Sequence, residues 1–354
     1  MASYDYVSES RVSKFFLRLF LAVLGLAVGL FAYAFAWLSK TNYSNVSIVD
    51  QLSGMSVSSE YSDINQMSSG GRIPVYVNDN FPIKRVAKID NRVDNFLIIG
   101  VDSRGEQTAR TDTMMVMSVD KRHGAIKLTS LMRDIEVDLP GREGAQDKLN
   151  AAYSWGGIGL LINTINENFN LDIQRFMMVD FWSSTKIVDD MGGITINVSE
   201  AEVGATNNIL GEMNILLDHP TGSGMLTSAG EQTLDGTQAV AWARIRSIDS
   251  DHVRTGRQRQ VVTAMFEKFS YLSLPKKLST VTTILEDMET NMTQLDIMGM
   301  GFSALGPMNN TMEYNVPKDE SMYTTNTSNW NIILNWEAQN ADLHRFIFEE
   351  APEK

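Results

Sequence analysis

The sequence predicts a layered α/β fold, in which helices flank a central mixed β-sheet and a single transmembrane helix precedes the sheet. Three observations predict this architecture. Short apolar runs bounded by turn residues are typical of buried strands. Segments with helical apolar spacing alternate with these runs, as they do in layered α/β domains. A long uncharged apolar stretch near the N-terminus is typical of a membrane span.

The composition excludes several classes of protein. The chain has 354 residues, 43% of them hydrophobic, which suffices for one sizeable domain with appendages. Its formal net charge of -13 argues against a general nucleic-acid binder, because such proteins need a basic surface. The chain has no cysteine, so disulfides, thiol nucleophiles and cysteine-ligated zinc are excluded. None of the four histidines has the spacing of a metal-ligand motif.

Residues 15–40 are predicted to form a transmembrane anchor. Leu19–Leu38 carries no charged residue and is long enough to cross a bilayer. A cleaved signal peptide is the alternative, but its apolar core would be only about 7–15 residues long. Because Arg11 and Lys14 precede the stretch, residues 1–14 are expected to be a cytoplasmic tail and everything after the anchor extracellular.

Changes in composition divide the rest of the chain into three parts. Residues 41–92 are rich in Ser, Asn, Asp and Gly, and are predicted to be an extracellular stalk or linker. Residues 93–272 carry the patterned strands and helices and are predicted to be the main domain. Residues 273–354 are weakly patterned and are predicted to be a C-terminal extension that packs partly on the core, through Trp330 and Trp336.

Three strands at the start of the main domain are predicted to organise the fold. A turn at His123-Gly124 makes the second and third of them a hairpin. Hairpin geometry returns Arg133, after the third strand, to the side of Asp112, near the start of the second. If the first strand lies beside them, Asp102 and Asp112 stand at the two ends of one loop on the same sheet edge. The three strands are Phe96–Val101, Thr113–Val119 and Ala125–Met132.

The later elements alternate between helices and strands, which favours a layered fold. The predicted strands are 176–179 and 194–198. The predicted helices are 147–155, which Gly156-Gly157 stops, and then 158–169, 186–191, 237–243 and a long helix from near Arg254 through Phe269.

Two groups of arginines occur in this acidic chain. The first is Arg104, Arg110 and Arg133, and the second is Arg244, Arg246, Arg254 and Arg257. Several guanidinium groups that converge on one place recognise a di- or polyphosphate. The paired carboxylates of Asp102 and Asp112 beside them suit a hard cation such as Mg²⁺. A surface of ordinary salt bridges is the alternative for any single Arg–Asp pair.

The start of the long helix is predicted to favour an anion. Arg254, Arg257 and Gln258 lie at positions i, i+3 and i+4 and share one face of its first turns. A helix N-terminus already favours negative charge, so this face suits a phosphate. Arg259 points elsewhere and is predicted to be a surface residue.

The residues named above resemble the LytR–CpsA–Psr family of membrane-anchored cell-wall enzymes, from about Asn95 to Phe269. Several spaced motifs occur in the family's order. They are Phe-Leu-Ile-Ile-Gly-Val-Asp-Ser-Arg (96–104), Arg-Thr-Asp-Thr-Met-Met (110–115), Arg133-Asp134, Lys-Leu-Asn-Ala-Ala-Tyr (148–153), Gly156-Gly157, Met-Gly-Gly (191–193), Ala-Arg-Ile-Arg (243–246), and Asp251-x-x-Arg254-x-x-Arg257-Gln258.

The resemblance implies that residues 93–272 are the catalytic domain of a phosphotransferase. Such an enzyme moves a glycopolymer (wall teichoic acid, capsule or a related polysaccharide) from a polyprenyl-pyrophosphate lipid onto peptidoglycan. Its partners are the lipid-linked polymer, peptidoglycan and membrane lipid, with no nucleic acid. The resemblance and the topology together imply a single-pass protein of a Gram-positive-type cell membrane. A polyprenyl-pyrophosphate hydrolase and a non-enzymatic membrane-bound regulator remain as alternatives.

The resemblance also assigns site residues. It implies that Asp102 and Asp112 bind the metal, Mg²⁺ or Mn²⁺, and that Asp251 is a further acidic residue of the catalytic site. The groups that it implies for pyrophosphate are Arg110, Arg133, Arg244, Arg246, Arg254 and Gln258, and Arg133 counts among the catalytic residues as well. Arg104 and Arg257 join the pyrophosphate-binding set from the spacing argument.

Overall fold

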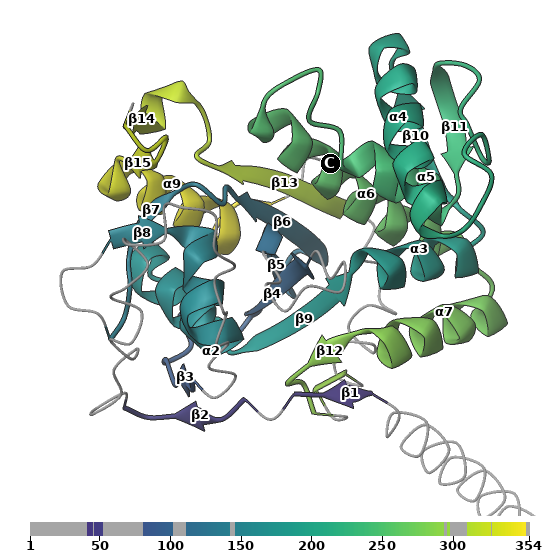
Figure 1. Ribbon diagram of the computed structural model, residues 1–354. Helices are drawn as coiled ribbons and strands as arrows, with labels where there is room; N and C mark the ends of the chain where they lie inside the picture. The colour runs from purple at the N-terminus through teal and green to yellow at the C-terminus, as the bar shows by residue number, and fades with distance from the viewer. Residues whose placement is uncertain are drawn as a thin grey trace, which may run out of the picture. The chain divides into compact units, whose positions relative to one another are not determined.

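A seven-stranded mixed β-sheet lies at the centre of the fold in this computed structural model (Figure 1). The structure describes residues 41–44, 46–51, 81–101, 111–141, 146–293, 296–297, 310–326 and 328–351. Contacts divide the chain into two units, Met1–Thr41 and Asn42–Lys354, and the fold given below is that of the second. In spatial order the strands of the sheet are β1 (Asn42–Tyr43), β12 (Glu289–Thr290), β9 (Arg175–Asp180), β4 (Val93–Val101), β5 (Thr111–Asp120), β6 (Ala125–Leu131) and β13 (Asn310–Val316).

The predicted hairpin is confirmed as β5 and β6, which pair antiparallel with Met114 opposite Leu131. Gly124 lies in the turn with a φ of 59°, a left-handed value that glycine adopts without a side-chain clash. β4 pairs antiparallel with the other side of β5. The end of β4, the start of β5 and the end of β6 therefore reach one edge of the sheet. We call this edge the rim and define it by Val101, Thr111 and Leu131.

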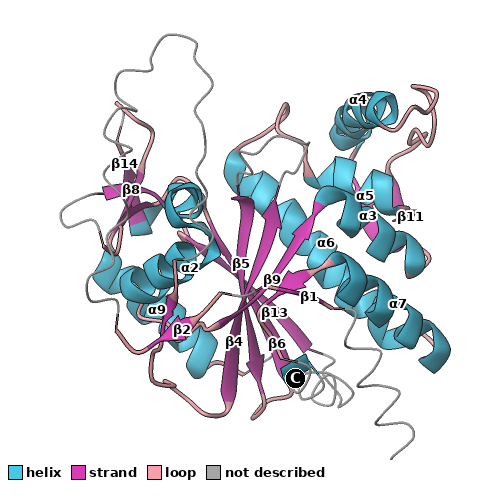
Figure 2. Ribbon diagram, turned by 60° about the horizontal axis from the view of Figure 1, so that its bottom comes forward, coloured by secondary structure: helices cyan, strands magenta, loops and turns pink. Residues whose placement is uncertain are grey.

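Helices cover both faces of the sheet, as predicted. α2 and α9 lie on one side of the strands, and α3, α5, α6 and α7 lie on the other (Figure 2). Apolar side chains of β4 and β5, including Leu97, Ile99 and Val116, form the main core together with α2 and α9. The helices are α2 (Leu149–Phe169), α3 (Phe181–Asp190), α4 (Glu200–Leu216), α5 (Gly236–Ala243), α6 (Asp251–Tyr271), α7 (Leu274–Asp287), α9 (Trp336–Phe348) and the short 3₁₀ helix η2 (Glu320–Met322).

Further strands form two-stranded sheets outside the central one. The predicted strand at residues 194–198 belongs to one of them. The pairs are β2 (Ile48–Val49) with β3 (Ile83–Lys84), β7 (Glu136–Asp138) with β8 (Gln146–Lys148), β10 (Ile194–Val198) with β11 (Gly230–Leu234), and β14 (Tyr323–Thr325) with β15 (Ile332–Leu334).

Local capping decides where the helices begin. The Ser250 side chain accepts a hydrogen bond from the Val253 backbone, so α6 starts at Asp251 and not near Arg254 as predicted. The predicted stop at Gly156-Gly157 is a break within α2, because both glycines have non-helical dihedral angles. The residues before α2 are extended in β8, so the first predicted helix begins two residues later than expected.

Short strands lie within the segments predicted to be the linker and the C-terminal extension. β1, β2 and β3 fall within residues 41–92; β1 pairs with β12 of the central sheet, and β2 pairs with β3. Gly159 of α2 lies so close to the chain that a Cβ there would be 1.8 Å from the Phe81 carbonyl oxygen. β13 supplies a strand to the central sheet from residues 273–354. Composition does not predict strands in such short, polar segments, because their pairing with residues distant in the sequence decides whether they form.

The two tryptophans of the predicted extension differ in their surroundings. Trp336 packs on the main core, as predicted, and its ring centroid lies 5.1 Å from that of Phe169. Trp330 is 71% exposed, so the prediction that it packs on the core is wrong. Among the described residues no helix is both long and apolar enough to span a bilayer. The predicted anchor at residues 15–40 lies outside these residues.

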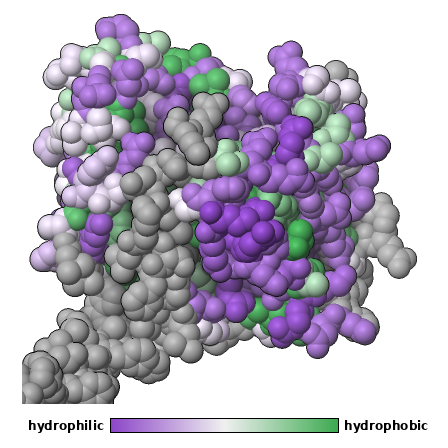
Figure 3. Space-filling view, turned by 180° about the vertical axis from the view of Figure 1, so that it is seen from behind, coloured by the Kyte–Doolittle hydropathy of each residue, from purple (hydrophilic) through white to green (hydrophobic). Residues whose placement is uncertain are grey.

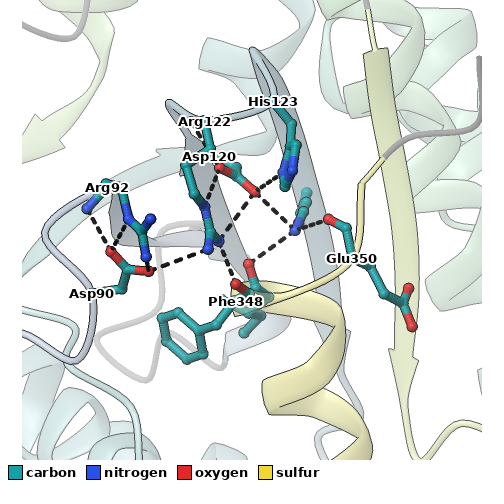
Figure 4. Close-up of polar contacts among 9 residues, drawn as sticks. Asp90, Arg92, Asp120, Arg122, His123, Phe348 and Glu350 are labelled. Atoms are coloured by element: carbon teal, nitrogen blue, oxygen red, sulfur yellow. Dashed lines mark hydrogen bonds and ion pairs between the residues drawn. The ribbon is translucent and has the colours of Figure 1, made fainter.

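A buried ionic cluster joins the hairpin turn to the C-terminal end of α9 (Figure 4). Lys127 and Asp120 have fully buried side chains that lie 3.1 Å apart. Lys127 also donates to the Ile347 and Glu350 carbonyl oxygens, at 3.0 and 2.5 Å. Burial raises the pKa of Asp120, but hydrogen bonds from His123, Arg122 and Lys127 outweigh it and hold the pKa at about 2. The cluster therefore ties the last helix to the central sheet.

Candidate active site

The first residue of α6 joins the two arginine groups that the sequence placed far apart. The Asp251 Oδ1 atom lies 2.7 Å from an Arg254 Nη2 and 3.6 Å from an Arg133 Nη2. Arg133 comes from the rim, two residues after β6, whereas Asp251 and Arg254 come from the first turn of α6. Because both guanidinium groups meet one carboxylate, the predicted convergence of these arginines is present in the fold.

A second carboxylate extends this arrangement. Asp134 lies 3.4 Å from Arg133 Nε and 2.6 Å from Lys148 Nζ. Lys148, Asp134, Arg133, Asp251 and Arg254 therefore form a chain of alternating charges with three cations and two anions. Such a chain keeps its cations oriented and leaves an excess of positive charge for an anionic ligand.

Lys148 and Asp134 were quoted in the sequence motifs but not assigned to the site. Lys148 follows Asp134 by 14 positions, so no helical or strand spacing links the two side chains. The antiparallel pair of β7 and β8 brings them together, with Glu136 opposite Lys148. In the sequence, only the two short polar segments on either side of the turn at Gly141 could have indicated this pairing.

The inner face of α6 is polar and buried. Arg254 is 1% exposed and Gln258 is 8% exposed. Within the described residues the Gln258 Oε1 atom has no hydrogen-bond partner. A buried amide oxygen without a protein partner costs free energy, so this position is one where a ligand or water group would bind.

Arg257 differs from its neighbours on α6, because two carboxylates of this chain bind its guanidinium group. Its Nε atom donates to Glu202 of α4 at 2.7 Å, and both of its Nη atoms contact the Asp249 carboxylate. Burial alone would lower the pKa of Arg257, but the bonds to Asp249 and Glu202 outweigh it and raise the pKa. Arg257 is therefore a structural cation that joins α4, α6 and the loop between α5 and α6.

Arg257→Ala should lower the free energy of unfolding by about 3 kcal/mol, because the variant leaves two largely buried carboxylates without their cation. Arg257→Lys should recover only part of this loss, since a single ammonium cannot bridge both groups. Urea unfolding followed by circular dichroism measures both values. An Arg257→Ala protein of unchanged stability that no longer binds a polyprenyl pyrophosphate would return Arg257 to the binding set.

Arg259 was predicted to lie on the surface, and this prediction is wrong. Arg259 is only 8% exposed. Its guanidinium group donates hydrogen bonds to Glu313 at 2.6 Å, to Ser130 at 3.1 Å and to Asn315. These partners belong to β6 and β13, so Arg259 fastens α6 to the sheet. A helical wheel of α6 shows polar residues all round and could not distinguish this inward arginine.

Of the remaining predicted site residues, two lie at the end of α5 and the side chains of the others lie outside the described residues. Arg244 ends α5 and is half-buried, Ile245 behind it is fully buried, and Arg246 is exposed. Asp102, Arg104 and Arg110 fall outside the described residues, as does the side chain of Asp112.

The backbone nevertheless locates position 112 at the rim. Val101 pairs with Thr111 and Gly100 pairs with Thr113, so residue 112 is the additional residue of a β-bulge. Bulges of this kind are frequent beside active sites. Within the described part of the chain, no group of three acidic or histidine residues could hold a metal ion.

A family model and curated relatives both match most of the chain. The model of the LytR_cpsA_psr family matches residues 55–342. The polyisoprenyl-teichoic acid–peptidoglycan teichoic acid transferase TagU of Oceanobacillus iheyensis is 31% identical over 261 residues, which cover 66% of this chain and 74% of that protein. The corresponding transferase TagT of Bacillus subtilis is 28% identical over 226 residues, which cover 62% of this chain and 66% of that protein.

Solved structures share the fold. A structure described as TagT bound to LIIa-WTA has a TM-score of 0.59 and 22% identity, and the match covers 74% of this chain and 94% of that chain. A structure of YwtF (TagT) with bound octaprenyl pyrophosphate lipid has a TM-score of 0.55 and 20% identity, with the same coverage of both chains. At this level of identity the two structures support the α/β architecture alone.

Proposed function

The chain belongs to the LytR–CpsA–Psr family, and from this premise we propose that it is a phosphotransferase that moves a glycopolymer from a polyprenyl-pyrophosphate lipid onto peptidoglycan. Relatives named as teichoic acid–peptidoglycan transferases support this activity. The observation that carries it is the meeting of Arg133 and Arg254 on Asp251 at the rim. Guanidinium groups held in this way are suited to a pyrophosphate.

The cations of the site bind and orient the donor in this proposal. Arg133 and Arg254 contact the pyrophosphate, and Asp251 holds their guanidinium groups in place. An acceptor hydroxyl oxygen of peptidoglycan then attacks the phosphorus atom that carries the polymer. The bond from that phosphorus to the bridging oxygen breaks, polyprenyl monophosphate leaves, and the hydroxyl proton passes to a water molecule. The arginines stabilise the negative charge that develops on the leaving phosphate.

The proposal includes a divalent cation, Mg²⁺ or Mn²⁺, held by Asp102 and Asp112. The β-bulge at residue 112 supports it, because Val101 and Thr111 pair and so bring the two ends of the loop together. Two carboxylates completed by substrate phosphate oxygens are a donor set that Mg²⁺ takes readily. When bound, the cation would neutralise part of the pyrophosphate charge.

Asp102→Ala and Asp112→Ala should each abolish turnover that depends on Mg²⁺, while the melting temperature changes little, because residue 112 lies at the rim of the sheet and Asp102 directly follows Val101 in the sequence. Initial rates over a Mg²⁺ titration, with a chelator control, provide the measurement. Full activity of either variant in the presence of chelator would remove the metal from the proposal. A large fall in melting temperature would indicate a structural ion pair instead.

The proposed location follows from the sequence. Residues 15–40 would anchor the protein in the cell membrane, with residues 1–14 in the cytoplasm and the catalytic domain outside. This topology places the site on the side where a lipid-linked polymer and peptidoglycan meet.

The activity itself is tested with the full chain in detergent micelles. The protein is incubated with a polyprenyl-pyrophosphate glycan, peptidoglycan fragments and Mg²⁺, and the products are identified by mass spectrometry. A phosphodiester-linked conjugate together with polyprenyl monophosphate is the expected result. Release of the phosphorylated glycan without a conjugate would identify a hydrolase, and unchanged donor would contradict both enzymatic readings.

A further inference from the structure

An exposed tryptophan lies in a strained backbone position between β14 and β15. Seen from behind, most of the described surface is hydrophilic and apolar side chains appear only in scattered places (Figure 3). Trp330 is one of the most exposed large apolar residues described, at 71%. Its φ is 59°, in the left-handed region. Asn170 and Asp218 are the other described residues, apart from glycines, with positive φ, and both are residue types that tolerate it.

The conformation and exposure of Trp330 do not stabilise the folded protein. A bulky side chain in the left-handed region is unfavourable, and an indole in water gains no burial. Glycine or asparagine would suit this backbone better. Residues held in such unfavourable backbone conformations cluster at active sites and ligand-binding positions, so the strain at Trp330 points to a contact with another molecule.

Hydrogen bonds hold the tryptophan in this arrangement. The Trp330 backbone N–H donates to the Asn326 carbonyl oxygen at 2.8 Å, and the Asn326 N–H donates to the Asn331 carbonyl oxygen at 2.9 Å. The Asn331 N–H donates to the Asn329 side chain at 3.1 Å. The indole is thus presented on a preorganised support rich in neutral amide groups.

The support is attached directly to the candidate active site. The Ile332 N–H donates to the carbonyl oxygen of Asp134, the residue after Arg133, at 2.9 Å. The Asn331 side-chain amide donates to Glu136 at 2.6 Å. Figure 1 shows β15 beside β7, which follows Arg133 in the chain. A molecule in contact with Trp330 would therefore adjoin the site.

We propose that Trp330, with Asn326 and Asn329, binds the glycan backbone of the peptidoglycan acceptor. An indole ring stacks on the C–H face of a sugar, and neutral amides exchange hydrogen bonds with its hydroxyl and acetamido groups. The donor is already held through its charged pyrophosphate, whereas the sugar units of the acceptor present a C–H face, hydroxyl groups and acetamido groups. This inference rests on the proposed function, since that function supplies the acceptor.

The test is glycan binding by the full chain in detergent micelles. The probe is peptidoglycan glycan strands freed of stem peptides, and the dissociation constant is measured by isothermal titration calorimetry. Trp330→Asn should weaken binding at least about tenfold, the size of effect found for an anchoring tryptophan. Its melting temperature should equal or exceed that of the wild type, because asparagine tolerates this φ. Trp330→Phe, which keeps a stacking ring, should stay within about threefold of the wild type.

A matched control comes from Tyr271, which is 89% exposed at the last position of α6. It lies 20 residues after Asp251, about 30 Å along the helix from the site. Tyr271→Asn should leave glycan binding unchanged. Unchanged binding by Trp330→Asn, or an equal loss in Tyr271→Asn, would overturn the proposal.

Transfer kinetics separate this inference from the proposed function. In Trp330→Asn the KM for the acceptor should rise about tenfold, while kcat and the KM for the lipid donor stay the same. A rise in the donor KM alone would place the indole on the donor and overturn the acceptor assignment. A wild-type protein that binds glycan strands without transferring polymer would contradict the proposed function and leave the binding site standing.

Discussion

Arg133→Ala and Arg254→Ala should each lower kcat/KM for transfer by at least about 100-fold, the loss typical of removing one charged group that stabilises a transition state. Both guanidinium groups meet the Asp251 carboxylate, at 3.6 and 2.7 Å, and in the proposed function both contact one pyrophosphate. The double variant should lose less than the product of the two single effects, because the two groups share one ligand. Initial rates with a polyprenyl-pyrophosphate glycan as donor give the complete double-mutant cycle.

The control for this cycle is Arg92→Ala. The Arg92 side chain is 64% exposed and pairs with Asp90, and the variant should retain wild-type kcat/KM. Independent, multiplicative losses for Arg133 and Arg254 would place them at separate sites. Arg254→Ala is assayed at a temperature where circular dichroism shows it folded, since Arg254 is also buried.

Lys127→Met should lower the free energy of unfolding by about 3–5 kcal/mol, the cost typical of removing one partner from a buried ion pair. The variant leaves the buried Asp120 carboxylate without its fully buried cation and two carbonyl oxygens of the C-terminal segment without their donor. Urea unfolding monitored by circular dichroism measures the loss. Lys186→Met is the matched control, because its pair with Asp287 is exposed on the lysine side and should contribute at most about 1 kcal/mol.

The pH dependence of the free energy of unfolding tests whether the Lys127–Asp120 ion pair causes this loss. The folded pKa of Asp120 is about 2, against an ordinary value of 3.8. A carboxylate with a depressed folded pKa contributes stability that is present above about pH 4 and is lost as the pH falls toward 2. Removing Lys127 weakens one cause of the depression, so the acid-induced loss of stability should become smaller in Lys127→Met. An unchanged acid profile would show that the other partners alone set the Asp120 pKa.

The hairpin and the rim could be predicted because their causes are local. Alternating apolar runs around His123-Gly124 define β5 and β6, and antiparallel pairing then returns Arg133 to the start of β5. The helix start near Arg254 was missed by three residues, because the cap is the single side chain of Ser250. The strands within residues 41–92 were missed because two-residue segments have no periodicity of their own.

The sequence by itself determined the α/β class, the sheet edge of the candidate site and the family, because these depend on periodicity, turn residues and spaced motifs. Only the tertiary structure decided what each arginine of α6 does. Arg254 meets Asp251 at the rim, Arg257 is bound by Glu202 and Asp249, and Arg259 is bound by Glu313. The difference arises because the partners of Arg257 and Arg259 include acidic side chains more than 50 positions away in the chain. Which carboxylate a guanidinium reaches is set by how distant segments pack, and no local pattern contains that information.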